Sequence, residues 1–408
     1  MNFNPIVLSI PIYFLLIGIE LIIERFSRKK IYRLNDAVTN ISCGITQQLT
    51  GIFFKVFTIA IYQFVFENYA LFELDNSTWW YWVILALGVD FFYYWAHRMS
   101  HEINLFWGGH VVHHQSEDYN FSVALRQSTF QVLWTFMFFM PLALAGFNTL
   151  DFLLVSALNT VYQFWIHTET IGKLGWLEYI FNTPSHHRVH HGRDPKYIDK
   201  NHAGSLIIWD KMFGTFQEEE ERPTYGITTP TNSWNPVWVN FNHYVGMWDS
   251  LKRIKGFGNK LKYIFYKPGW LPEELGGYQS APSVDKNTYK KYDTDSSMSL
   301  NWYVLFQYLV ALAGTALFLF NESTFNYIEK GAISAAIILT ITNCGILFEG
   351  KKWGWYSEYI RIVLFSSVVA YISFGSSDMI MAAGSILFAL ISIGWLLSLR
   401  RKNNLATS

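Results

Sequence analysis

The chain has 408 residues, of which 51% are hydrophobic, 18% aromatic and only 15% charged. A soluble globular domain carries about 25% charged residues, so the deficit points to a lipid environment. The net charge is zero, and no basic patch with interleaved aromatic residues suggests binding to nucleic acid.

Seven apolar stretches predict membrane-spanning helices, which need about 20 apolar residues to cross the hydrocarbon core. The predicted spans are residues 5–24, 44–66, 79–95, 303–320, 331–348, 360–374 and 379–397. The first has no positive region before it and no small-residue cleavage site, so we expect a span rather than a signal peptide. The run 130–166 is too long for one span and is broken near residues 146–148, which predicts a helical hairpin that either crosses fully or re-enters from one side.

Positive charge gives an orientation, because cytosolic loops of membrane proteins carry an excess of Lys and Arg. The loop 67–78 carries acidic residues and no Lys or Arg. Alternate threading of the spans then places the basic loops, and with them residues 97–127 and 167–298, in the cytosol. The basic residues follow the first and the last span: Arg25, Arg28, Lys29, Lys30, Arg400, Arg401 and Lys402.

The predicted fold class is therefore all-α, a polytopic membrane helical bundle with a cytosolic cap that carries histidines and a two-metal site. We divide the chain into N-terminal spans (1–96), a catalytic region with the membrane hairpin 130–166 (97–250), a basic amphipathic connector (251–300) and C-terminal spans (301–408). Such a protein would lie in the endoplasmic reticulum of a eukaryote or the inner membrane of a bacterium. Residues 251–267 predict a helix lying on anionic headgroups, with a simply solvated helix as the alternative.

The histidines carry the strongest signal, since ten of the twelve lie between His97 and His191. An H-x3-H pair places two side chains on one face of a helix, and H-x2-H-H does the same for three. A lone histidine is more often a satisfied core residue than a ligand. A pair and two triplets together indicate metal, because neutral imidazole is the commonest transition-metal ligand. The pattern comprises His97 and His101, then His110, His113 and His114, then His187, His190 and His191, with His167 between.

These nine imidazoles are too many for one metal ion and suit two. The sequence His101–Glu102 lacks the second histidine of a zinc-protease helix. The two cysteines, Cys43 and Cys344, lie far apart in apolar stretches and are expected to be inert core thiols rather than zinc ligands. Iron with imidazole ligands at a membrane surface suits oxygen activation and attack on a C–H bond.

The three histidine motifs resemble the eight-histidine signature of the fatty acid hydroxylase/sterol desaturase superfamily, and WDKMFGTF (residues 209–216) resembles its usual ending. Within that superfamily the chain is most similar to the alkylglycerol monooxygenases. This likeness is carried by HRMSHEINLFWGGHVVHHQSEDYNFSVALRQS (97–128), FWIHTE (164–169), NTPSHHRVHHGRD (182–194) and IDKNHAGSLIIWDKMFGTF (198–216). It is strong over residues 90–242 and only a hydropathy match in the terminal spans.

The resemblance implies that the eight histidines of the three motifs bind two irons, with His167 as an additional ligand. His186 is ambiguous between a ligand and a neighbour of ligands, and His202 and His243 lie outside the pattern. Two acidic residues are expected to assist catalysis from beside the ligands. Asp90 is seven residues before His97 and so on the same helical face, where orienting an imidazole would be its role. Its alternatives are a buried pair with Arg98 or simply an acidic residue near a helix end. Glu102 flanks the same motif.

The resemblance also implies a reaction. An alkylglycerol would be hydroxylated at the carbon next to its ether oxygen, giving a fatty aldehyde and a glycerol derivative, with O2 as co-substrate and tetrahydrobiopterin as reductant. The chain has no flavin, dinucleotide, Fe–S or haem motif, so its reductant must be external. The alternative is a sterol, carotenoid or fatty-acyl hydroxylase or desaturase that uses a protein electron donor. A membrane metal transporter is disfavoured, because its ligands would lie at mid-membrane. The reductant site, the exact lipid and the oligomeric state do not follow from the sequence.

Overall fold

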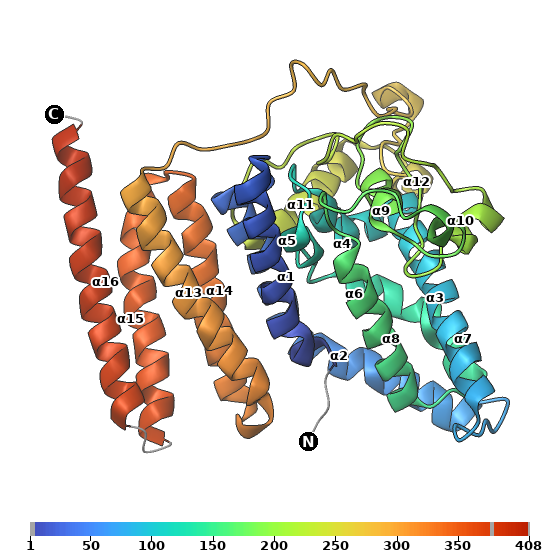
Figure 1. The fold of residues 1–408 in the computed structure, drawn as a ribbon, viewed down its shortest axis with the longest axis horizontal. Helices are drawn as coiled ribbons and strands as arrows, with labels where there is room; N and C mark the ends of the chain where they lie inside the picture. Colours follow the sequence, from blue (N-terminus) through green and yellow to red (C-terminus); the bar gives the residue numbers. More distant parts are fainter. Residues whose placement is uncertain (1–4, 376–378, 407–408) are drawn as a thin grey trace. The chain divides into compact units, whose positions relative to one another are not determined.

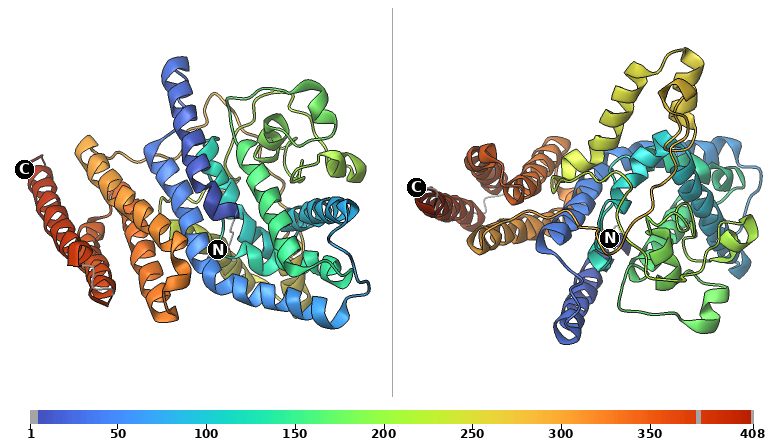
Figure 2. Two further views of the ribbon diagram at one scale, coloured as in Figure 1. Left: turned by 60° about the horizontal axis from the view of Figure 1, so that its bottom comes forward. Right: turned by 90° about the horizontal axis from the view of Figure 1, so that it is seen from above.

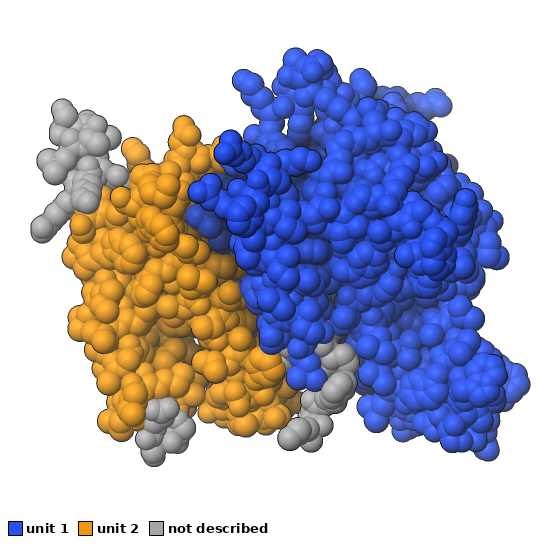
Figure 3. Space-filling view, in the orientation of Figure 1, with its two compact units in different colours: residues 1–231, 240–291 blue, residues 232–239, 292–408 orange. Residues whose placement is uncertain are grey.

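A computed structural model of the chain describes residues 5–375 and 379–406, with side chains described from residue 8 to residue 400. The predicted Arg401 and Lys402 therefore lie outside the described side chains. Within the described ranges the regular structure is helical, and two isolated β-bridges are the only extended pairings. This confirms the all-α class. The chain divides into two compact units, residues 1–231 with 240–291, and residues 232–239 with 292–408 (Figure 3). The four-part division of the sequence stays a prediction.

Unit 1 begins with three long helices, α1 (Pro5–Ser27), α2 (Leu34–Tyr69) and α3 (Trp79–Glu102), followed by α4 (Asn104–His114) and α5 (Phe121–Ala124). The predicted hairpin consists of α6 (Gln131–Thr135), the 3-10 turn η1 (Phe136–Phe139) and α7 (Met140–Leu144), and then α8 (Thr149–Trp165). The break between α7 and α8 falls at the predicted residues 146–148. Further elements complete the cap: η2 (Gly175–Tyr179), α9 (Pro184–His190), α10 (Ile208–Phe213), α12 (Phe257–Phe265), η3 (Glu273–Leu275) and α11 (Pro236–Arg253) (Figure 1). Residues 236–239 of α11 belong to unit 2 and the rest of that helix to unit 1.

Two apolar clusters hold the long helices of unit 1 together. Tyr62 of α2 packs with Tyr81 and Leu85 of α3 and Leu142 of α7, while Tyr13 of α1 belongs to a second cluster with α5 and α8. Burial of each such side chain contributes about 1.5–3 kcal/mol. The first cluster holds the N-terminal half of α3, and the second includes Phe164 at the end of α8, three residues before His167.

Unit 2 consists of α13 (Met298–Phe320), the turn η4 (Glu322–Thr324), α14 (Tyr327–Phe348), α15 (Lys352–Gly375) and α16 (Met379–Ala406). Consecutive helices pack side by side, as all three views show (Figures 1 and 2). A buried polar network crosses the bundle: the Glu358 carboxylate accepts hydrogen bonds from Tyr303 and pairs with Arg361, whose Nη2 also donates to Gln307 Oε1 at 2.8 Å.

Membrane-spanning character is clear in five helices. Within the described residues, α2, α13, α14, α15 and α16 are long and apolar enough to cross a bilayer. Helices also form over the other two predicted spans, as α1 and α3, but these two are not among the five. In α3 the many Trp and Tyr residues and Asp90 lower the mean hydropathy. The protein is thus a multi-pass membrane protein.

The connector helix predicted over residues 251–267 is wrong as a single helix. Instead α11 ends at Arg253 and α12 begins at Phe257. Between them Gly256 has a φ of 78°, a left-handed conformation that glycine adopts without a steric cost and that ends a regular helix.

Candidate metal centre

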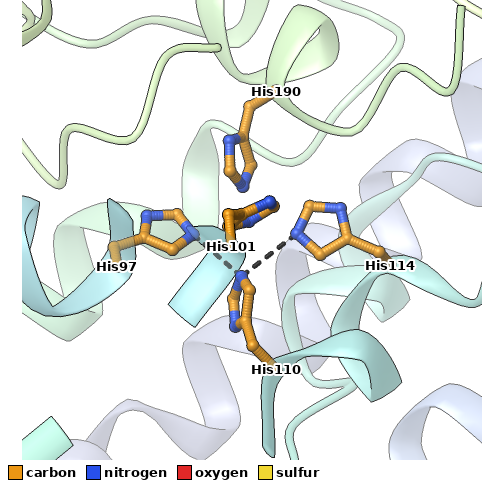
Figure 4. A group of neighbouring side chains, drawn as sticks. All are labelled: His97, His101, His110, His114 and His190. Atoms are coloured by element: carbon orange, nitrogen blue, oxygen red, sulfur yellow. Dashed lines mark hydrogen bonds between the residues drawn. The ribbon is translucent and has the colours of Figure 1, made fainter. Parts of the chain in front are cut away.

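Nine buried histidines converge into two groups inside the cap of unit 1. Within each group the ligand atoms all lie within 4.8 Å of one another. Figure 4 shows the rings of the first group pointing toward a common centre from α3, α4 and α9. The first group consists of His97, His101, His110, His114 and His190, and the second of His113, His167, His187 and His191.

Helical spacing explains which histidine joins which group. Residues four apart are neighbours on one helix face. The pairs His97 and His101, His110 and His114, and His187 and His191 accordingly each share a group. The histidine three residues along in each triplet, His113 or His190, joins the other group. Each triplet therefore serves both groups, which the sequence motif alone does not reveal.

Backbone carbonyls fix the tautomer of four of these imidazoles. His97 Nδ1 lies 2.7 Å from the carbonyl of His202, and His190 Nδ1 lies 2.9 Å from that of Lys200. In the second group His113 Nδ1 is 2.9 Å from Arg126 O, and His167 Nδ1 is 2.7 Å from Gln163 O. A carbonyl can only accept, so each Nδ1 carries the proton and each Nε2 is left with its lone pair. A metal-binding histidine is typically oriented in this way.

The Nε2 atoms of His113 and His167 then face one another with no proton between them. His113 Nε2 and His167 Nε2 are 3.2 Å apart, and both rings already donate through Nδ1. Two lone pairs at this distance repel unless a cation lies with them. Among the described residues, the Nε2 atoms of His101, His190 and His191 have no hydrogen-bond partner. A set of convergent, neutral imidazoles fits one transition-metal ion in each group.

Burial keeps these rings neutral. It lowers the pKa of His113 to about 4 and holds the pKa of His114 and His190 well below the usual value for histidine. Neighbouring imidazoles lower the pKa of His114 and His190 further. The rings are thus in the form that binds metal at neutral pH.

The first group depends on a loop, residues 199–203, that supplies two of the fixing carbonyls. Asp199 and Asn201 in this loop have φ values of 56° and 55°, a left-handed conformation that Asn and Asp tolerate better than most residues. The buried Asp210 carboxylate accepts from the backbone N–H groups of His202 and Ala203, each at 2.8 Å. Sequence reasoning missed the role of Asp210, although it belongs to the family-like string at 209–216.

Asp90 holds the residues that follow this loop rather than an imidazole, so the expected direct contact with a ligand is not formed. Its carboxylate accepts from the N–H groups of Ser205 and Leu206 and from Trp209 Nε1, at 2.7 to 3.0 Å. A Cβ on Gly204 would lie 2.9 Å from Asp90 Oδ1, so the loop can pass this close only with glycine there. Asp90 does not pair with Arg98 either. Its geometry allows it to act on His97 only through the loop.

Glu102 also stands apart from the imidazoles. Its carboxylate accepts from Arg98 Nε at 2.9 Å, in a pair that is about a quarter exposed. The side chain lines an open groove of about 470 Å³, together with Lys267, Trp270 and Tyr278. The Asp199 carboxylate links the groove to the first group, because it lies 3.6 Å from Lys267 Nζ, which lines the groove, and 3.5 Å from His101 Nδ1.

The second group is supported from another side. Arg126, whose carbonyl orients His113, is buried, and its guanidinium donates to Val112 O, Asn40 Oδ1 and Gln115 Oε1 at 2.6 to 2.9 Å. The ring of Tyr119 lies 5.2 Å from that of His191, between centroids, and its hydroxyl donates to Ile166 O beside His167. This support comes from α2, α4 and α8, not from the loop 199–203.

The three remaining histidines lie outside both groups. His186 packs against Phe216, and His243 lies 3.0 Å from the Asn104 side chain. His202 is fully buried, with its ring centroid 5.0 Å from that of His101, and contributes its carbonyl rather than a ligand atom. Cys43 and Cys344 are buried free thiols.

The region that carries the two histidine groups is also the region that matches a known protein family. Residues 82–215, which include all nine clustered histidines, match the fatty acid hydroxylase family model. Human alkylglycerol monooxygenase is 42% identical over 87% of this chain and 80% of its own length. The enzymes of that name from Xenopus tropicalis and Danio rerio are 40% and 38% identical, over 80% and 74% of their own lengths. No solved structure shows a significant match to the chain.

Proposed function

The chain belongs to the alkylglycerol monooxygenase family and is an oxygen-dependent lipid monooxygenase, and from this premise we propose that it cleaves the ether bond of alkylglycerols. Insertion of one oxygen atom at the carbon next to the ether oxygen gives a hemiacetal. The hemiacetal collapses to a fatty aldehyde and a free glycerol hydroxyl. The other oxygen atom leaves as water, which requires two electrons from an external tetrahydropterin.

The nine clustered histidines are proposed as the ligands of two irons, one in each group. The observation that supports this best is the pair of Nε2 atoms of His113 and His167, facing at 3.2 Å with both Nδ1 atoms committed to carbonyls. Iron held there would supply activation of dioxygen and attack on an unactivated C–H bond.

The chain's own residues prepare that chemistry. Backbone carbonyls orient four of the imidazoles. The loop 199–203, which Asp210 holds and which leads into the segment bound by Asp90, keeps His97 and His190 in position. Burial of all nine rings excludes water from the ligands. Glu102 lies at the groove beside the first group, where it is proposed to assist turnover without binding metal.

The test of the reaction offers the purified protein an alkylglycerol and a tetrahydropterin under oxygen. Fatty aldehyde is the expected product. An ester-linked lipid of equal chain length is the matched control, because its carbon next to the oxygen is a carbonyl with no hydrogen to remove. Activity only with a ferredoxin or cytochrome reductase system, on sterol or acyl chains and never on ethers, would overturn the ether-cleaving proposal.

The cap is proposed to face the cytosol, in the endoplasmic reticulum of a eukaryote or the inner membrane of a bacterium. The basic residues that support this are Arg25 in the last turn of α1 and Arg28, Lys29 and Lys30 directly after it. A reporter fused after residue 402 is expected in the cytosol and one inserted near Asp75 on the opposite side. The reverse labelling would contradict this topology while leaving the chemistry untouched.

A further inference from the structure

Six apolar side chains lie exposed together on the cap of unit 1. They come from η2 and the residues that follow it, and from α10. Trp176, Tyr179 and Met212 expose 71%, 74% and 66% of their surface. Scattered exposed apolar residues are normal, but a contiguous patch indicates an interaction surface. We call this patch the aromatic lip: Trp176, Tyr179, Ile180, Phe181, Met212 and Phe213.

Hydrogen bonds join the two segments of the aromatic lip into one surface. Ile207 N donates to Ile180 O at 2.9 Å, and Phe181 and Leu206 form a β-bridge. Lys211 Nζ donates to the carbonyls of Glu178 and Tyr179 and lies 5.4 Å from the centre of the Tyr179 ring. The patch is therefore built into the fold and is not a loose loop.

The aromatic lip continues an apolar stripe on α3. Trp79, Val83 and Leu87 are exposed at intervals of four residues along that helix, as expected for a face turned to lipid. Phe91 and Trp95 extend the stripe but are covered by α10: the ring of Phe213 lies 6.2 Å from Phe91 and 5.0 Å from Trp95. The exposed side chains of α10 thus begin where the exposed part of α3 ends.

The contact between α10 and α3 lies at the level along α3 where a membrane surface is expected, just below the histidines. A helix rises about 1.5 Å per residue, so Phe91 and Trp95 lie roughly 9 and 3 Å below His97 along α3. Trp and Tyr concentrate at the boundary between headgroups and acyl chains. A lysine at the edge of such a patch can lay its aliphatic stem on apolar rings and keep its ammonium among polar groups, as Lys211 does.

We propose that the aromatic lip is immersed in the interfacial layer of the bilayer that the protein spans, and that it seats the cap on the membrane beside α3. Phe181 directly precedes Asn182 and α9, so the lip places the segment that carries His187, His190 and His191 against the lipid surface. This inference concerns membrane contact and does not depend on the metal or the substrate.

The test measures the depth of single spin labels in phosphatidylcholine vesicles. Trp176→Cys, Tyr179→Cys and Met212→Cys are labelled one at a time, and Glu220→Cys and Lys290→Cys, on exposed residues elsewhere on unit 1, are the matched controls. Cys43 and Cys344 are buried and leave the new thiol as the accessible one. Power saturation then compares collision of each label with oxygen, which partitions into lipid, and with a water-soluble nickel complex.

Labels at the three lip positions are expected to collide with oxygen in preference to nickel, and both controls with nickel in preference to oxygen. Nickel access at the lip equal to that of the controls would overturn the proposal, because the lip would then face water. Protection of the lip labels from both reagents would overturn it as well, since a second protein chain and not lipid would cover the patch.

Discussion

The two histidine groups are built from the same three-motif pattern, yet they rest on different parts of the chain. The first has five imidazoles, two of which are oriented by carbonyls of the loop 199–203. The second has four, two of which are oriented by carbonyls of Arg126 and of Gln163 in α8. Two sites of equal chemistry can thus differ in how many ligands they can lose and in which distant residues control them.

The largest effect is expected from removing one ligand of each group. His113→Ala and His190→Ala should both abolish aldehyde formation, because each group loses an imidazole. The second group falls to three ligands and the first to four. Metal analysis should therefore find that His113→Ala loses one of its two metal ions, while His190→Ala keeps more of both. Full turnover in either variant would contradict the ligand assignment, provided that both variants remain in the membrane fraction.

The next largest effect is expected from residues that support only one of the two groups. The Asp210 carboxylate accepts hydrogen bonds from the backbone N–H groups of His202 and Ala203. Asp210→Asn replaces one of these oxygens with an NH2 group, which cannot accept, so it should displace the loop 199–203. Loss of such an outer partner typically costs about 10- to 100-fold in metal affinity or activity. We expect about a tenfold loss of activity, with weaker metal binding in the first group only. Asp285→Asn, at an exposed turn, is the control and should change neither quantity.

Arg126→Lys should weaken the second group and leave the first unchanged. A lysine ammonium cannot span the three acceptors that the planar guanidinium reaches. We expect about a tenfold loss of activity with weaker metal binding in the second group. Metal titration of both variants measures this directly. Identical loss from both sites in Asp210→Asn and Arg126→Lys would show that the two groups respond as one unit and would break the comparison.

Glu102→Gln should have the smallest effect. It removes a charge from a partly exposed pair with Arg98, which is worth at most about 1 kcal/mol of stability. Thermal stability and the content of both metals should be nearly unchanged, while the turnover rate falls. A loss of metal as large as the loss of rate would instead make Glu102 part of the metal site.

The sequence predicted much of this arrangement because its main signals are local. Helical spacing places His110, His113 and His114 together whatever the rest of the chain does, and apolar length alone predicts α13 to α16. The division of each triplet between two groups depends on where α9 meets α4, which is a contact between distant segments. The partners of Asp90 and Asp210 could not be foreseen for the same reason, since both hold a loop whose backbone conformation leaves no regular pattern.

Because each triplet supplies both groups, the donors of the two groups are synthesised in a fixed order. A growing chain that has reached residue 183 already contains four of the five donors of the first group, but only His113 and His167 of the second. At about 5–20 residues per second, the stretch from 115 to 183 occupies the ribosome for several seconds. The first group is thus the earlier one to hold most of its donors, although His190 and the loop 199–203 that orients His97 are made later. The second group gains its third donor only with His187, and the two groups are completed one residue apart, at His190 and His191.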